Sequence, residues 1–200
     1  MTTPFFTIGH STRSIEDFVA LLRSADVGLV ADVRSVPRSR TNPQYNRDVL
    51  GETLAGFGIG YEHIASLGGL RGKRLSRDAS PNGFWENDSF RSYADYALSA
   101  EFRDGLAQLR TLGAQRRTAC MCAEAVWWRC HRRIIADYLL AAGETVFHIL
   151  GPGHVDVAQM TPVARSNGQG GLLYPAKRER APGPLSRGGS APGRRAAARP

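Results

Sequence analysis

The sequence lacks the features that would place the chain in a membrane or among disulfide-rich secreted proteins. No uncharged apolar run approaches the roughly 18 residues that mark a transmembrane helix. The N-terminus has no basic segment followed by an apolar one, so we expect no secretory signal. Only three cysteines are present, all within positions 120–130, which are too few and too close together for a disulfide framework. These absences predict a reduced, cytoplasmic protein with no membrane partner.

Signatures of nucleotide cofactors are missing as well. Neither a P-loop nor a G-x-G-x-x-G sequence occurs, so no motif supports the use of ATP or NAD. The 200 residues are 42% hydrophobic and 22% charged, which are ordinary values for one globular domain with a real core.

The basic charge of the chain is concentrated at its C-terminal end. The formal net charge is +8, and residues 177–200 contribute +6 of it, so residues 1–176 are close to neutral. The segment 177–200 has one leucine and no aromatic residue, and it cannot bury enough apolar surface to fold. We therefore expect a single domain over residues 1–176 and a disordered Arg/Pro/Gly/Ala-rich tail over 177–200. The tail is interpreted as solvated, with weak, salt-sensitive binding to nucleic acid or another polyanion as the alternative.

Short apolar runs alternate with amphipathic segments along residues 1–176. Five runs have the length and composition of strands: 5–8, 28–34, 60–64, 117–122 and 145–150. Helices are predicted after four capping residues and over one further segment: Ser14, Asn46, Ser89 and Ser99, and residues 129–142. This alternation predicts an α/β fold, a mostly parallel sheet of about five strands with helices on both faces.

In such sheets, ligands bind beyond the carboxyl ends of the strands. The chain places polar residues at each predicted strand end, and these should meet at one edge: His10, Asp32, Arg34, Glu62, His63, Cys122, Glu124 and His148.

The densest chemistry lies in residues 120–133. Cys122 and Glu124 are expected to leave the fourth strand, and Cys130 and His131 to lie in the first turn of the next helix. In one interpretation Cys122 or Cys130 is a thiolate nucleophile, because a helix N-terminus and neighbouring basic groups lower a thiol pKa. Glu124 would then act as acid or base, or orient His131.

Two other interpretations of this segment stay open. Cys122, Cys130 and His131 can ligate zinc or iron, with Glu124 as a fourth ligand or a base. Adjacent residues of a helix diverge, which weighs against a site that needs both Cys130 and His131. In the third interpretation the cysteines are small core residues and the arginines are solvated. Thiol or acid–base chemistry is favoured, and Cys120 is interpreted as plain core.

A second cluster follows the second predicted strand. Asp32 and Arg34 share a face of that strand, and a carboxylate there needs a partner, so the two can form a structural ion pair. Alternatively, guanidinium groups line an edge that suits a phosphate or carboxylate. The candidates for anion binding are Arg34, Arg38, Arg129 and Arg132. His10 is either an acid–base group or a histidine that holds the turn.

Several separate motifs together resemble the domain of unknown function 488 family. The matching segments are residues 7–11 (TIGHS), 32–34 (DVR), 37–40 (PRSR), 42–43 (NP), 67–69 (LGG), 90–96 (FRSYADY), 121–124 (MCAE) and 128–132 (WRCHR). The resemblance covers roughly residues 4–150 and assigns no activity. It implies a small bacterial or archaeal intracellular α/β domain with these hallmark positions: His10, Arg34, Cys122, Glu124, Cys130, His131 and Arg132.

Together these observations predict an enzyme with a pocket at the carboxyl edge of a parallel sheet. Its ligand is expected to be an anion of the nucleotide or nucleic-acid class, and Cys122, Glu124, Cys130 and His131 are expected to supply the chemistry. The alternative is a non-catalytic module that binds nucleic acid through the arginine-lined edge and the basic tail.

Overall fold

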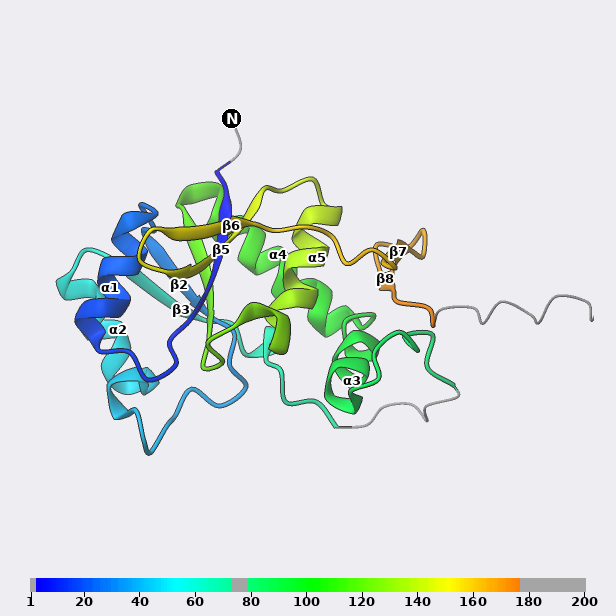
Figure 1. The fold of residues 1–200 in the computed structure, drawn as a ribbon, viewed down its shortest axis with the longest axis horizontal. Helices are drawn as coiled ribbons and strands as arrows, with labels where there is room; N and C mark the ends of the chain where they lie inside the picture. Colours follow the sequence, from blue (N-terminus) through cyan, green and yellow to red (C-terminus); the bar gives the residue numbers. More distant parts are fainter. Residues whose placement is uncertain (1–2, 73–78, 177–200) are drawn as a thin grey trace, which may run out of the picture.

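The computed structural model describes residues 3–72 and 79–176 (Figure 1). The tail predicted over residues 177–200 lies outside these residues. No helix in the described part of the chain has both the length and the apolar character that a membrane crossing requires.

A six-stranded sheet with the order β3-β2-β4-β1-β5-β6 forms the centre of the fold (Figure 1). Its strands are β1 (Phe5–Gly9), β2 (Leu29–Asp32), β3 (Gly60–His63), β4 (Thr118–Cys122), β5 (Val146–Gly151) and β6 (His154–Val157). The first five pair in parallel, and β6 is antiparallel to β5. The predicted fold class, α/β with a mostly parallel sheet, is confirmed. The sixth strand and a separate short hairpin of β7 (Arg165–Ser166) and β8 (Leu172–Leu173) were not predicted.

Helices cover both faces of the sheet, as expected for parallel strands. The helices are α1 (Ile15–Ser24), α2 (Arg47–Gly56), α3 (Asp88–Tyr96), α4 (Ala100–Gln115) and α5 (Arg132–Ala141), with short 3₁₀ turns at Pro43–Tyr45, Ala65–Leu67 and Trp127–Arg129. Successive residues of β1 point to opposite faces, so Phe6 packs with α1 and α2 while Phe5 packs with α3, α4 and α5. Two apolar cores therefore hold the sheet between them.

The helix starts test the predicted caps. Ser14 and Ser99 do cap, since their hydroxyls accept from the backbone N–H groups three residues on. The prediction for Ser89 is wrong, because the Oδ1 of Asn87 accepts from the Ser89 N–H at 2.8 Å and α3 begins earlier. Asn46 precedes α2, but its side chain accepts from the N–H of Ser39 instead.

The start of α5 also differs from the prediction of a helix over residues 129–142. Helix α5 begins at Arg132, after a 3₁₀ turn that ends at Arg129. Cys130 between them is extended, with φ −129° and ψ 148°, and His131 is the N-cap with φ −56° and ψ −18°. Cys130 and His131 are therefore not successive residues of one helix.

Candidate functional site

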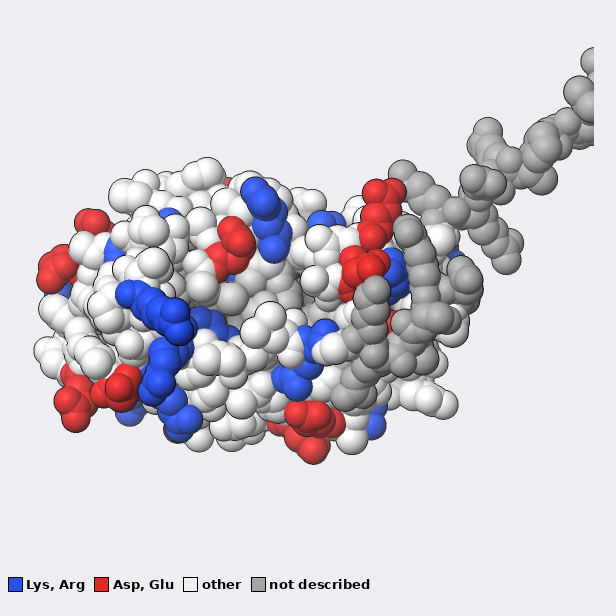
Figure 2. Space-filling model, turned by 90° about the horizontal axis from the view of Figure 1, so that it is seen from below, with Lys and Arg blue, Asp and Glu red and all other residues white. Residues whose placement is uncertain are grey.

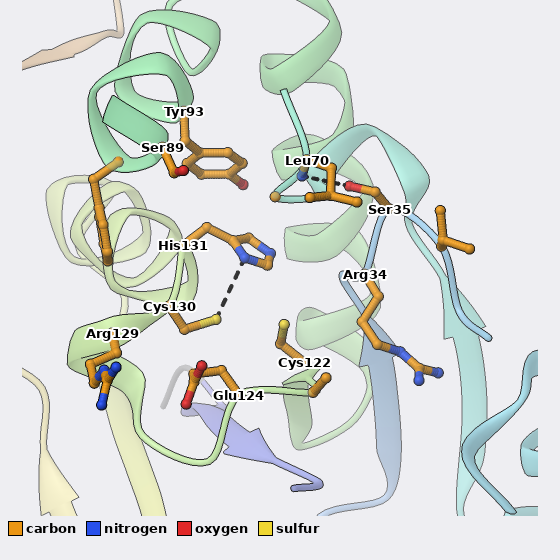
Figure 3. Close-up of a pocket in the computed structure, with 14 residues that line it drawn as sticks. Arg34, Ser35, Leu70, Ser89, Tyr93, Cys122, Glu124, Arg129, Cys130 and His131 are labelled. Carbon is orange, nitrogen blue, oxygen red and sulfur yellow. Dashed lines mark hydrogen bonds between the residues drawn. The ribbon is translucent and has the colours of Figure 1, made fainter. Parts of the chain in front are cut away.

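A pocket of about 310 Å³ opens where β2 and β4 end (Figure 3). We call it the site pocket. Its walls come from four separate parts of the chain: residues 34–36 after β2, residues 69–70, the α3 residues Ser89, Phe90 and Tyr93, and the β4–α5 connection, which contributes residues 122–124 and 129–131. The strands of the parallel sheet run toward this side of the molecule, and Figure 2 views that side. On this face, basic side chains lie on both sides of the centre, and most of the acidic side chains lie nearer the edge of the molecule (Figure 2).

Three side chains with metal-ligating or nucleophilic atoms meet on the pocket wall. The ligand atoms of Cys122, Cys130 and His131 all lie within 4.8 Å of one another. Cys122 is the last residue of β4, whereas Cys130 and His131 return to the same place from the turn before α5. The predicted convergence of these residues at the carboxyl edge is thus present in the geometry.

The ring of His131 has a defined orientation. Its Nε2 lies 2.8 Å from the carbonyl oxygen of Val33, and since a carbonyl only accepts, Nε2 carries the proton. The other ring nitrogen, Nδ1, lies 3.5 Å from the sulfur of Cys130, where it can accept from the thiol or, when the ring carries a second proton, donate to the thiolate (Figure 3). Gly69 packs against this ring, because a Cβ at that position would lie only 2.4 Å from Nδ1.

The two sulfurs of the cluster differ in their affinity for a proton. Burial disfavours ionisation of Cys130, but a hydrogen bond from the Cys122 thiol and the charge of His131 outweigh it and lower the pKa of Cys130 well below its ordinary value. Donating that bond, together with burial, raises the pKa of Cys122. Cys130 is therefore the sulfur of the pair that ionises more easily, and Cys122 is the one that keeps its proton.

Arg132 donates a hydrogen bond to the sulfur of Cys130 from the buried side of the pocket wall. Its side chain is almost completely buried, and its Nε donates to the sulfur of Cys130 at 3.3 Å. The same guanidinium donates to the backbone carbonyl of Glu124, and so ties the loop after β4 to the start of α5. Arg132 does not line the site pocket, so the structure places this predicted anion-binding residue behind the wall.

Glu124 and Arg129 supply the charged part of the pocket wall. Both side chains are exposed, and both line the site pocket beside the sulfur–imidazole cluster. Close packing holds the Glu124 loop over β1, since a Cβ on Gly9 would lie 2.0 Å from the Glu124 carbonyl oxygen. A carboxylate and a guanidinium thus face the same space as the two thiols.

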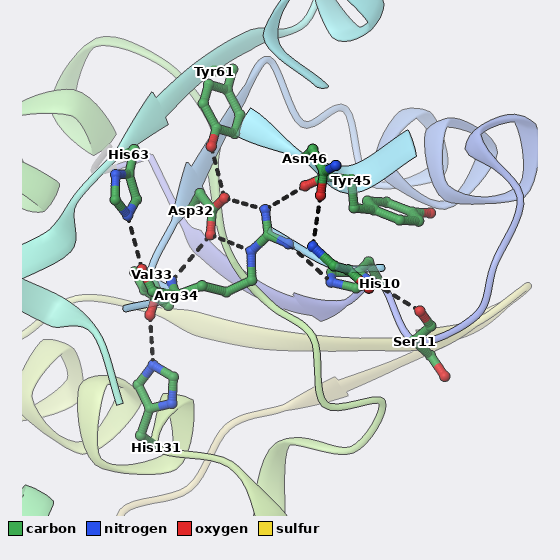
Figure 4. A network of polar contacts seen from close by, with 11 residues as sticks. His10, Ser11, Asp32, Val33, Arg34, Tyr45, Asn46, Tyr61, His63 and His131 are labelled. Carbon is green, nitrogen blue, oxygen red and sulfur yellow. Dashed lines mark hydrogen bonds and ion pairs between the residues drawn. The ribbon is translucent and has the colours of Figure 1, made fainter. Parts of the chain in front are cut away.

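The ion pair of Asp32 and Arg34 forms a buried network behind the pocket (Figure 4). The Arg34 guanidinium donates to both oxygens of Asp32, at 2.8 and 2.5 Å, and to the carbonyl of Tyr45 at 2.7 Å. The hydroxyl of Tyr61 donates to the same carboxylate at 2.7 Å. Arg34 lines the site pocket but is only 6% exposed. Most of its donors are engaged, so it is less suited to bind an anion than the sequence predicts.

His10 completes this network and lies outside the pocket lining. Its Nδ1 donates to the carbonyl of Ser11 at 2.8 Å, and its Nε2 accepts from Arg34 at 3.3 Å. The ring stacks on Tyr45 with centroids 4.1 Å apart. Burial lowers the pKa of His10 to about 4, partly opposed by the Ser11 carbonyl. His10 is therefore neutral and orients Arg34. This arrangement matches the alternative in which His10 holds the turn, rather than the one in which it acts as an acid or base.

Two further predicted residues lie away from the cluster. Arg38 is exposed and lines a different hollow with Arg47 and Asp48. The expectation that His148 reaches the carboxyl edge is wrong, because it sits inside β5, is 2% exposed and stacks on Trp127. Burial lowers its pKa to about 4.

Sequence reasoning missed a group of residues that line the pocket opposite the cysteines: Ser35, Val36, Gly69, Leu70, Ser89, Phe90 and Tyr93. Gly69, Phe90 and Tyr93 lie within motifs that carry the family resemblance, and this was the available signal. Tyr93 packs its ring edge-on against His131 with centroids 5.0 Å apart. Ser35 accepts from the Leu70 N–H at 2.8 Å, a contact that nothing in the sequence indicates.

Comparison with known proteins gives one positive result. The family described as "Domain of unknown function DUF488" matches residues 14–139, which is more than half of the chain. Neither the curated proteins nor the solved structures gave a match. The matched span includes the segments that build the site pocket, although it begins after the first strand. The chain belongs to the DUF488 family.

Proposed function

We propose that the protein is an enzyme of the cytoplasm that acts on an anionic substrate of the nucleotide or nucleic-acid class in the site pocket. The observation that carries this proposal is the convergence of Cys122, Cys130, His131 and Glu124 on one pocket wall. These are two sulfurs, an imidazole and a carboxylate, and each can donate or accept a proton or form a bond to a reacting atom.

The energetics of the cluster support a functional role. Burying a sulfur that carries charge disfavours folding unless neighbouring groups compensate. Here Cys122, His131 and Arg132 all turn toward the sulfur of Cys130. Groups with strongly shifted pKa values in a cleft are candidates for function, and the carboxyl edge of a parallel sheet is where ligands of such folds bind.

The pocket lining favours a ligand with a flat apolar part and a negative charge. Its volume is at the lower end of the usual range for small-molecule sites. Phe90, Tyr93 and Leu70 form an apolar side, on which a base or another ring can pack. Arg129 supplies an exposed positive charge on the wall, and further basic side chains lie on this side of the molecule, with acidic ones among them (Figure 2).

Turnover of a defined panel tests the proposal. The purified chain is incubated with nucleoside mono- and diphosphates and with a short 5′-phosphorylated DNA strand, and products are separated by chromatography. Glu124→Gln and Cys130→Ser should lower turnover by more than about 100-fold, the usual range for loss of a proton-transfer group. Glu52→Gln, an exposed change on α2, should leave it unchanged.

Two results would overturn the proposal. One is no turnover of any panel member, or equal turnover in all variants. The other is binding of the DNA strand that survives Glu124→Gln and Cys130→Ser and falls steeply with salt, without product. That second result would establish the non-catalytic nucleic-acid-binding alternative.

A further inference from the structure

We propose that Cys122, Cys130 and His131 bind a zinc ion, with the fourth coordination position open to the site pocket. The inference deepens the proposed function and rests on it for the role of the metal, but metal binding itself can be measured without a substrate. Two cysteine sulfurs, one histidine nitrogen and an open position are a known composition of catalytic zinc sites.

The distances fit a tetrahedral centre. With Zn–S near 2.3 Å and Zn–N near 2.0–2.1 Å, tetrahedral angles place sulfur and nitrogen about 3.6 Å apart and two sulfurs about 3.8 Å apart. The Cys130 sulfur and the Nδ1 of His131 lie 3.5 Å apart, and the three ligand atoms lie within 4.8 Å of one another. Small rotations of the side chains would bring all three to bonding distance.

The imidazole of His131 has the orientation that a metal ligand needs. A ligating histidine almost always donates its other N–H to a carbonyl, a carboxylate or water, and this fixes the ring and its tautomer. The Nε2 of His131 makes that bond to the carbonyl of Val33 at 2.8 Å, which leaves the lone pair of Nδ1 directed at the sulfurs. The sulfur of Cys130 likewise has a hydrogen bond from a residue that is not itself a ligand, because Arg132 donates to it. Such a bond orients a metal ligand.

The objection that adjacent residues of a helix diverge does not apply here. Cys130 is extended and His131 is the helical N-cap, so the change in backbone conformation turns their side chains to the same side. Figure 3 shows both side chains directed into the space that Cys122 enters from the other side. Residues that are neighbours in the sequence can therefore both ligate one ion.

The position of the cluster leaves room for a fourth ligand. A structural zinc site is closed by four protein ligands, whereas a catalytic site keeps one position for water or substrate. Cys122, Cys130 and His131 all line the site pocket, so an ion between them faces that space. Glu124 lines the same wall, where its carboxylate can accept a proton from a zinc-bound water.

Metal content and cobalt spectroscopy test the inference on the full chain. Protein purified without chelator should contain about one equivalent of zinc by elemental mass spectrometry. After removal of the metal, added Co²⁺ should give the strong visible absorption of tetrahedral coordination and a thiolate-to-cobalt charge-transfer band. Cys130→Ser and His131→Gln should each weaken zinc binding by more than about 100-fold in competition with a chromophoric chelator, since even second-shell changes cost 10- to 100-fold.

Cys120→Ala is the matched control, because this third cysteine lies fully buried in the core two residues before Cys122. It should retain full stoichiometry and the cobalt spectrum. The inference is overturned by a wild-type chain that binds no Co²⁺ in tetrahedral form, or by equal zinc affinity in Cys130→Ser. Circular dichroism of every variant establishes that the fold persists. Zinc binding without turnover would refute the proposed function alone, and turnover with no binding of zinc or Co²⁺ would refute this inference alone.

Discussion

The imidazole of His131 donates to the carbonyl of Val33, and the two residues are 98 positions apart in the chain. This carbonyl is available because β2 ends at Asp32, so beyond that residue its backbone no longer belongs to the β2–β3 ladder. The bond joins the N-cap of α5 to the carboxyl end of β2 and points Nδ1 at the sulfur of Cys130. The site thus depends on where one strand stops.

The contact between Gly69 and His131 predicts a selective loss. Gly69→Ala places a methyl group 2.4 Å from Nδ1, so the ring must leave the position in which Nδ1 faces the sulfur of Cys130. We expect zinc affinity to fall roughly 10- to 100-fold, as for other changes that reorient a ligand, while the melting temperature changes little. Gly72→Ala is the control, since a Cβ there meets nothing within 4 Å. Equal zinc affinity in the two variants would contradict the assigned orientation of His131.

Arg129 provides a test of anion binding. The side chain is exposed, so Arg129→Gln should leave the free energy of unfolding within about 0.5 kcal/mol of the wild type. Loss of one charge near 4 Å from a ligand in water is worth about 1 kcal/mol, which corresponds to roughly a fivefold higher KM for a nucleoside monophosphate. The effect should shrink at high salt. Arg47→Gln, at the other hollow, should leave KM unchanged, and an equal rise in both variants would point to general surface charge.

The sequence predicts the sheet and the segments that meet at its edge, because strand and helix periodicity is local. It does not predict the register, which depends on contacts between distant segments. His148 illustrates this: β5 extends to Gly151, and His148 pairs beside Thr7 in mid-strand, two residues short of the level of Gly9 and Cys122. A histidine near the end of an apolar run can therefore be fully inside the sheet.

The start of α5 could not be predicted for a similar reason. The residues at the start of α5 are held by distant partners: His131 donates to the carbonyl of Val33, and Arg132 donates to the carbonyl of Glu124. No capping residue marks the position, since His131 makes no side-chain capping bond. The sequence also could not predict that the donors of Arg34 are already engaged, because Tyr45 and His10 contact its guanidinium from other elements.

The two buried histidines predict acid sensitivity of the fold. The pKa of His10 and that of His148 are each lowered to about 4, below the ordinary 6.5, so the folded chain favours their neutral forms. Well above pH 6.5 both histidines are neutral in the folded and the unfolded chain, so neither makes the free energy of unfolding depend on pH. As the pH falls from 6.5 toward 4, the unfolded chain takes up protons that the folded chain does not, and the free energy of unfolding decreases. Each histidine contributes a slope of at most about 1.4 kcal/mol per pH unit.

Urea denaturation from pH 8 to pH 4.5 measures this slope. His10→Gln keeps an acceptor for Arg34 and cannot be protonated, so its slope should be shallower than that of the wild type. His154→Gln changes an exposed histidine on β6 and should leave the slope as it is. An unchanged slope in His10→Gln would mean that His10 is not held neutral by the fold.

The buried pair of Asp32 and Arg34 predicts a large loss of stability when one partner is replaced. Asp32→Asn removes the carboxylate that accepts from Arg34, and breaking a buried pair in this way typically costs about 3–5 kcal/mol of unfolding free energy because one charge is left without a partner. Asp48→Asn, an exposed carboxylate in the first turn of α2, should cost less than about 1 kcal/mol. Replacing Arg34 as well, in Asp32→Asn/Arg34→Met, removes the stranded charge, so the double variant should be more stable than the sum of the two single losses implies. Strictly additive losses in urea denaturation would mean that Arg34 finds another counter-charge, and its place on the pocket wall would then make a bound anion the first candidate.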